Sequence, residues 1–147
     1  MKRMIAITAA ILCVALTSAD AQKPKPRRST EPCANARTQL ELNECYCNQY
    51  KKADAEMNQV YQKLISTNTD NKLFIDKLRL AQRAWVSFRD AQLDAIYPVT
   101  DDPRAKYGSI YPMCYCMAQT ELTVERTKQL QRMLKSEEGD GCGWDVH

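Results

Sequence analysis

The side chains best suited to chemistry in this sequence are cysteines. Apart from Cys13 in the apolar N-terminal run, they form two Cys-x-Cys pairs and two single positions, namely Cys45 with Cys47, Cys114 with Cys116, Cys33, and Cys142. Thiols spaced in this way form disulfides or bind a metal ion. Metal-binding cysteines usually occur as Cys-x2-Cys rather than Cys-x-Cys. The spacing therefore favours disulfides, and we expect no metal site and no cofactor.

Other catalytic groups are scarce. The single histidine, His147, is the last residue, where a fraying terminus cannot hold a general base in place. No nucleophile–base pair and no phosphate-binding loop is readable, so we expect no enzymatic activity. The formal net charge is +3, from 21 basic and 18 acidic side chains. This balance is too even to indicate a nucleic-acid-binding protein.

The N-terminus indicates export. Basic residues 1–3, the apolar run 4–16 and the A-x-A site at 19–21 are typical of a cleaved signal peptide, here residues 1–21. A membrane anchor is the alternative, but the run is shorter than the roughly 20 residues of a spanning helix, and the mature chain has no other such run. Cleavage would remove Cys13 and leave six cysteines, an even number that favours disulfides in an oxidising compartment.

The mature chain is expected to begin with a solvated leader and continue as one helical domain. Residues 22–32 are basic and proline-rich, which is typical of a solvated segment. Apolar side chains then recur at three- and four-residue steps. They predict an all-α domain over 33–136, followed by a tail over 137–147.

Three main helices are predicted in that domain. Thr38 and Glu41 form a capping box that starts a helix running to about Ser66. A second helix covers 73–96 and has Phe88 on its apolar stripe. After a long loop over 98–108, Ser109 caps a third helix that has Met117 on its stripe and fades at 136–139. No β pattern is present. Three helices joined by one short and one longer loop then predict a disulfide-linked, up-down-up bundle in which the first and third helices are roughly parallel.

This arrangement places the two Cys-x-Cys pairs near the same end of the bundle. Residues two apart on a helix point to nearly opposite sides, so at most one cysteine of each pair faces the other helix. Its neighbour is left for Cys33 or another loop partner. Six cysteines allow 15 pairings. Cys142 follows the far end of the third helix, so its pairing requires the tail to fold back.

Several motifs together resemble the LprI-like lysozyme-inhibitor family over about 33–134. They are the segment 33–45, Ala53-Asp54, Met57-Asn58, Tyr61, residues 81–85, Arg89-Asp90, residues 108–112, Thr123, Arg126-Thr127 and Leu130. The resemblance implies a secreted or periplasmic all-helical domain and, through the named member, inhibition of lysozyme. Most members have no assigned activity. The chain also departs from the family pattern, because Leu93 stands where a cysteine is usual and Cys47 is extra, so the family's disulfide scheme is not transferred.

The resemblance also marks Trp85, Arg89, Asp90 and Arg126. We interpret Trp85 as a core residue and expect Arg89 or Arg126 to pair with Asp90 and hold the second helix against the third.

Function is assigned instead to the loop, since a rigid scaffold often presents recognition residues on loops. The candidate partner-binding residues are Asp101, Asp102, Arg104, Lys106 and Tyr107. They predict a protein partner, which is a lysozyme or another cell-wall glycosidase whose cleft is occluded. The alternative is an exported interaction module of the cell envelope with a different protein client.

Overall fold

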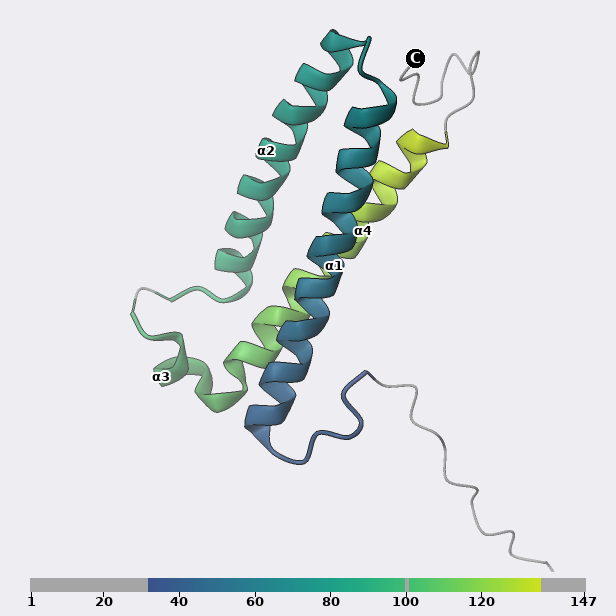
Figure 1. Ribbon diagram of the computed structural model, residues 1–147. Coiled ribbons are helices and arrows are strands. Elements are labelled where there is room, and N and C mark those ends of the chain that lie inside the picture. The colour runs from purple at the N-terminus through teal and green to yellow at the C-terminus, as the bar shows by residue number, and fades with distance from the viewer. Residues whose placement is uncertain (1–31, 100, 136–147) are drawn as a thin grey trace, which may run out of the picture.

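The computed structural model describes residues 32–99 and 101–135 (Figure 1). These residues form α1 (Gln39–Thr67), α2 (Lys72–Ile96), α3 (Pro103–Tyr107), the 3-10 helix η1 (Gly108–Ile110) and α4 (Tyr111–Leu134), with no strand among them. The all-α prediction is therefore confirmed. The expected signal peptide, most of the leader, the tail and Cys142 lie outside the described residues.

The first helix begins where its capping box predicts. The Glu41 amide donates to Thr38 Oγ1 over 3.2 Å, and the Thr38 amide donates to Glu41 Oε2 over 3.2 Å. Two backbone donors at the start of α1 are thus satisfied by side chains. At the other end Nδ2 of the buried Asn68 side chain donates to the Leu64 carbonyl over 2.8 Å, which satisfies a carbonyl of the last turn.

The predicted loop over 98–108 is wrong in its second half, which contains a short helix. Asp102 Oδ1 accepts from the Arg104 amide over 2.9 Å, and Pro103 follows at the first helical position. Proline breaks a helix interior, but its fixed φ suits the first turn. Gly108 then ends α3 with φ 72°, a backbone conformation that favours glycine.

The predicted cap at Ser109 is also wrong. α4 begins at Tyr111 without a side-chain cap, because η1 precedes it and leads directly into it. The Ser109 carbonyl instead accepts from the Asn43 side-chain amide over 3.0 Å, and this bond ties η1 to the first turns of α1.

The three long helices run up, down and up, as predicted, so that α1 and α4 point the same way and α2 runs against them (Figure 1). A core cluster of Met57, Leu64, Leu78 and Leu130 joins all three. α4 packs most closely on α1. The residues that α4 buries are mostly small, namely Cys116, Thr123 and Thr127, which allows the two backbones to approach one another.

The predicted apolar stripes differ from the buried faces at several positions, because Ala81 on α2 and Ile110 in η1 are exposed, and so are two larger side chains. Phe88 on α2 is 54% exposed and Met117 on α4 is 43% exposed. The buried face of α4 contains two threonines, which a search for apolar periodicity passes over. The Thr127 hydroxyl donates to the Thr123 carbonyl over 2.9 Å, so its burial leaves that group hydrogen-bonded.

Two disulfides hold the lower half of the bundle as it is drawn in Figure 1. Cys47 on α1 is bonded to Cys116 on α4, and Cys45 is bonded to Cys33, which precedes the helix. Each Cys-x-Cys pair thus supplies one cysteine to the bridge between α1 and α4. The neighbour of Cys47, Cys45, is bonded instead to Cys33, which lies outside the helices. This is the division of roles that helix geometry predicts.

Candidate functional site

The two regions that the sequence singles out lie in different parts of the molecule. The first is the Trp85 cluster, which consists of Trp85, Arg89 and Arg126. The Arg89 guanidinium carbon lies 5.4 Å from the Trp85 ring centroid, and that of Arg126 lies 6.0 Å from it. Trp85 is half-buried and packs on the core cluster, which agrees with a mainly structural role. Two cation–π contacts therefore meet on one indole.

The expected ion pair between α2 and α4 is absent, and other bonds link the helices. Arg89 pairs with its neighbour Asp90 on α2, at 2.8 Å between Nη2 and Oδ1. The side chain of Asp90 is 56% exposed, so it points away from the helix interfaces. Arg89 Nη1 donates to the Tyr50 hydroxyl on α1 over 3.3 Å, and Arg126 Nε donates to Gln82 Oε1 over 3.0 Å.

Arg126 lies among neutral partners. Its second bond, from Nη1, goes to Gln129 Oε1 over 3.0 Å, and no carboxylate among the described residues pairs with it. Burial lowers the pKa of Arg126 from its ordinary value, because desolvation disfavours the charged form. These contacts describe a guanidinium used to join α2 to α4.

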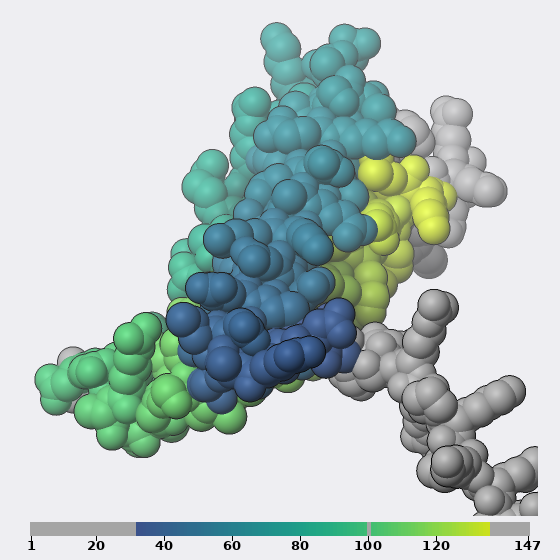
Figure 2. Space-filling view, turned by 60° about the horizontal axis from the view of Figure 1, so that its bottom comes forward, coloured from purple at the N-terminus to yellow at the C-terminus, as the bar shows by residue number. Residues whose placement is uncertain are grey.

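The second region is the α3 projection, defined here as residues 101–107. It stands out from the helical body next to the first turns of α4, as the ribbon and the space-filling view both show (Figures 1 and 2). Asp101, Asp102, Arg104 and Lys106 are exposed, whereas Tyr107 is half-buried. The structure thus brings acidic, basic and aromatic side chains together on one protruding element.

The base of the projection is a tyrosine cluster made of Tyr97, Tyr107, Tyr111 and Tyr115. The Tyr97 ring lies 5.5 Å from those of Tyr107 and Tyr111, both edge to face, and 5.9 Å from that of Tyr115. Tyr107 and Tyr111 stack at 5.8 Å. Sequence reasoning missed three of these residues, although the four-residue spacing of 107, 111 and 115 on consecutive helical turns was a readable signal.

Burial raises the pKa of Tyr97, Tyr111 and Tyr115 above the ordinary tyrosine value. Desolvation is the largest cause in each case, because it disfavours the phenolate. These three phenols are therefore neutral at physiological pH, and the contacts within the cluster are those of packed aromatic rings.

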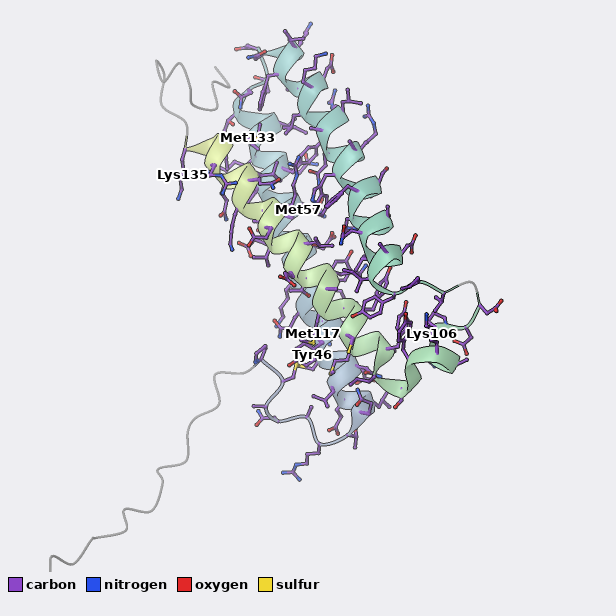
Figure 3. The ribbon with its side chains drawn as sticks, turned by 180° about the vertical axis from the view of Figure 1, so that it is seen from behind. Tyr46, Met57, Lys106, Met117, Met133 and Lys135 are labelled. Atoms are coloured by element: carbon purple, nitrogen blue, oxygen red, sulfur yellow. A yellow bond between two sulfur atoms is a disulfide. The ribbon has the colours of Figure 1, made fainter. Side chains whose placement is uncertain are left out.

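Local bonds hold the projection in one shape. Lys106 Nζ donates to the Pro98 carbonyl over 2.8 Å and lies 5.2 Å from the Tyr107 ring centroid. Figure 3 shows Lys106 beside the connection that leads into α3. With the Asp102 cap, these contacts leave Arg104 as an exposed cation whose side chain has no bond within the described residues. A preorganised element of this kind loses less entropy on binding.

The described residues contain no group of three or more His, Cys, Asp or Glu side chains placed to hold a metal ion. None of the helices they form is long and apolar enough to cross a membrane. What the arrangement offers chemically is a rigid, charged protrusion on a disulfide-linked scaffold. The described residues thus define a small, disulfide-linked helical domain.

The comparisons place this domain in a family. The family model described as "Lysozyme inhibitor LprI" matches residues 30–130, and the chain belongs to that family. An uncharacterized protein of Rhizobium meliloti (strain 1021) is 31% identical over 147 residues, which cover 92% of this chain and 99% of the relative. No solved structure matches. The family, together with the disulfides, indicates an extracytoplasmic protein with a protein partner.

Proposed function

We propose that this protein inhibits a lysozyme or a related cell-wall glycosidase by placing the α3 projection in the enzyme's cleft. The observation that supports this most directly is the protruding element itself, a short helix with exposed charges on a packed tyrosine base. Family membership supplies the class of client. Export through a signal peptide over 1–21 belongs to the same proposal, since lysozymes act outside the cytoplasm.

Arg104 is the residue that fits a glycosidase cleft best. Most glycosidases hold two carboxyl groups on either side of the scissile bond. A guanidinium can donate two parallel hydrogen bonds to a carboxylate. Arg104 is exposed and its side chain is uncommitted, whereas the Lys106 ammonium is already bonded to Pro98.

Charge complementarity with a basic lysozyme would have to be local, because the whole chain is positive at +3. Asp101 and Asp102 supply adjacent carboxyl groups at the start of the projection. Complementary potentials at the contact surface set specificity and association rate, so an acidic patch beside Arg104 would meet the basic rim of the enzyme.

The direct test is lysis of a peptidoglycan suspension by lysozymes of several classes in the presence of the purified mature protein. We expect wild-type protein to slow lysis at an equimolar ratio for at least one of them. Arg104→Glu should weaken that inhibition about tenfold or more, which corresponds to about 1.4 kcal/mol in binding. Its thermal midpoint should stay close to that of the wild type, because the side chain is exposed and makes no hydrogen bond or ion pair within the described residues.

Arg83→Glu is the matched control. Arg83 is also an exposed arginine whose side chain has no bond within the described residues, but it lies on α2. It should leave inhibition unchanged. If no lysozyme is inhibited by wild-type protein, the client is a different envelope protein. If Arg83→Glu and Arg104→Glu weaken inhibition equally, the effect is one of net charge and the projection is not the contact surface.

A further inference from the structure

A groove on the side of the bundle has mostly apolar walls and a thiol, with Gln49, Thr120 and Glu121 also among its lining residues. It is lined by Tyr46 on α1, by Cys114, Met117 and Ala118 on α4, and by Tyr97, which follows α2. Figure 3 shows Tyr46 and Met117 next to one another at this place. Met117 is 43% exposed. An apolar surface of this kind is typical of a contact site.

Cys114 is the one described cysteine without a partner. The other four form the bridges Cys33–Cys45 and Cys47–Cys116. If residues 1–21 are removed as proposed, Cys13 is lost with them, and the remaining chain contains one further cysteine besides Cys114, namely Cys142. In an oxidising compartment two such thiols are expected to pair, so the question is whether they can do so within one chain.

Chain length argues against an intrachain bridge. Lys135, the C-cap of α4, follows Cys114 by 21 residues. At a rise of 1.5 Å per residue, the Cα atoms of Cys114 and Lys135 are therefore about 31 Å apart. The seven residue steps from Lys135 back to Cys142 span at most about 25 Å. A disulfide tolerates a Cα–Cα distance of at most about 6.8 Å. An intrachain bridge would therefore need residues 136–141 to be fully extended and the Cα–Cα distance of the disulfide to be at its maximum.

We propose that the groove binds the C-terminal segment 136–147 of a second copy of this chain, joined to it by a Cys114–Cys142 disulfide between the two chains. Because chain reach imposes no such limit between molecules, two copies can exchange their segments symmetrically. Trp144 lies two residues beyond Cys142 and supplies a large apolar side chain to the groove. The proposal does not depend on lysozyme binding.

The chemistry is thiol–disulfide exchange. Each interchain bond forms from one Cys114 thiol and one Cys142 thiol, which together lose two protons and two electrons. The electrons pass to the disulfide of an oxidoreductase of the compartment, which leaves as a dithiol.

The test uses exported protein in two forms, one unlabelled and one labelled with 15N. They are mixed, reduced, reoxidised with a glutathione couple, and analysed without further reduction. We expect a covalent dimer, and a tryptic peptide pair joining Cys114 to Cys142 in which about half of the pairs contain one labelled and one unlabelled member. The proposal would be overturned by a monomer in which both members of every Cys114–Cys142 pair are labelled or both are unlabelled. It would also be overturned if the Cys114 and Cys142 thiols both remained open to alkylation.

Two variants separate specific docking from incidental oxidation. Cys142→Ser should abolish the covalent dimer and make Cys114 available to iodoacetamide, while Cys47–Cys116 stays intact. Trp144→Ala should keep both thiols but lower the dimer yield at a fixed glutathione ratio severalfold. An unchanged yield, or a dimer joined through two Cys114 residues, would show that the groove does not bind the segment.

Discussion

At the scale of single residues, Trp85 has the clearest consequence for stability. Its indole packs on the core cluster and contacts two guanidinium groups, those of Arg89 and Arg126. We expect Trp85→Ala to lower the free energy of unfolding by about 3 kcal/mol, because it leaves a cavity and removes both cation–π contacts. Urea denaturation followed by circular dichroism measures this, with Trp85→Phe as the milder control.

The same variant tests where binding occurs. At temperatures well below its thermal midpoint, the Trp85→Ala protein should still inhibit lysozyme, because the contacts that hold the α3 projection do not involve Trp85. If the folded variant loses inhibition while Arg104→Glu retains it, then the face of α2 around Trp85 and Arg89 is the binding surface and the structural role assigned to Trp85 is wrong.

At the scale of elements, the two disulfides should contribute unequally. Cys47–Cys116 closes a separation of 69 residues, and Cys33–Cys45 closes one of 12. In the loop-entropy model, losing the first costs about 4 kcal/mol and losing the second about 3 kcal/mol. Two variants test this order by urea denaturation, one with Cys47→Ala and Cys116→Ala, the other with Cys33→Ala and Cys45→Ala. Equal losses would mean that residual structure in the unfolded chain already restricts the longer loop.

The tyrosine cluster predicts instability at alkaline pH. Burial raises the pKa of Tyr97, Tyr111 and Tyr115 in the folded protein, so the unfolded chain releases these protons first. Their contribution to stability is complete below the ordinary tyrosine pKa of about 10 and is lost as the pH rises above it. The free energy of unfolding should therefore fall as the pH rises above about 10 and through the raised pKa values of the folded protein.

Phenolate absorbance near 295 nm provides the second measurement for this cluster. In the native protein, part of this absorbance should develop at a higher pH than it does in urea-unfolded protein. Tyr97→Phe combined with Tyr115→Phe should reduce both the difference and the alkaline loss of stability, because phenylalanine keeps the ring contacts without a titrating group. Native and unfolded curves that coincide would contradict the raised pKa values.

At the scale of the whole molecule, net charge predicts how salt affects association. The chain is positive at +3 and becomes +2 if residues 1–21, with Lys2, Arg3 and Asp20, are removed. Toward a basic lysozyme, long-range repulsion slows encounter, and salt screens it over a Debye length of about 10 Å at 0.1 M. Association should therefore become faster with added salt, as stopped-flow fluorescence can measure. Slower association would mean that attraction at the contact surface outweighs this repulsion, either from Asp101 and Asp102 toward a basic enzyme or toward an acidic client.

Much of the helical framework followed from sequence alone, because its determinants are local. A capping box needs only Thr38 and Glu41, which are three residues apart, and the periodic stripes define long helices whatever surrounds them. The roles of the two cysteine pairs also followed, since residues two apart on any helix face nearly opposite ways. For the candidate site, the sequence identified the charged residues of the projection and Tyr107, but not the other three tyrosines of its base.

Only the tertiary structure decided the features that depend on how each helix is rotated about its axis. It left Phe88 and Met117 exposed, buried Thr123 and Thr127, paired Asp90 within α2, and placed Arg126 beside Trp85. Local patterns cannot settle these contacts. Apolar periodicity identifies a broad face, whereas the rotation of a helix is set by how closely its side chains fit those of its neighbours, and small residues such as Thr123 can occupy the closest approach better than large apolar ones.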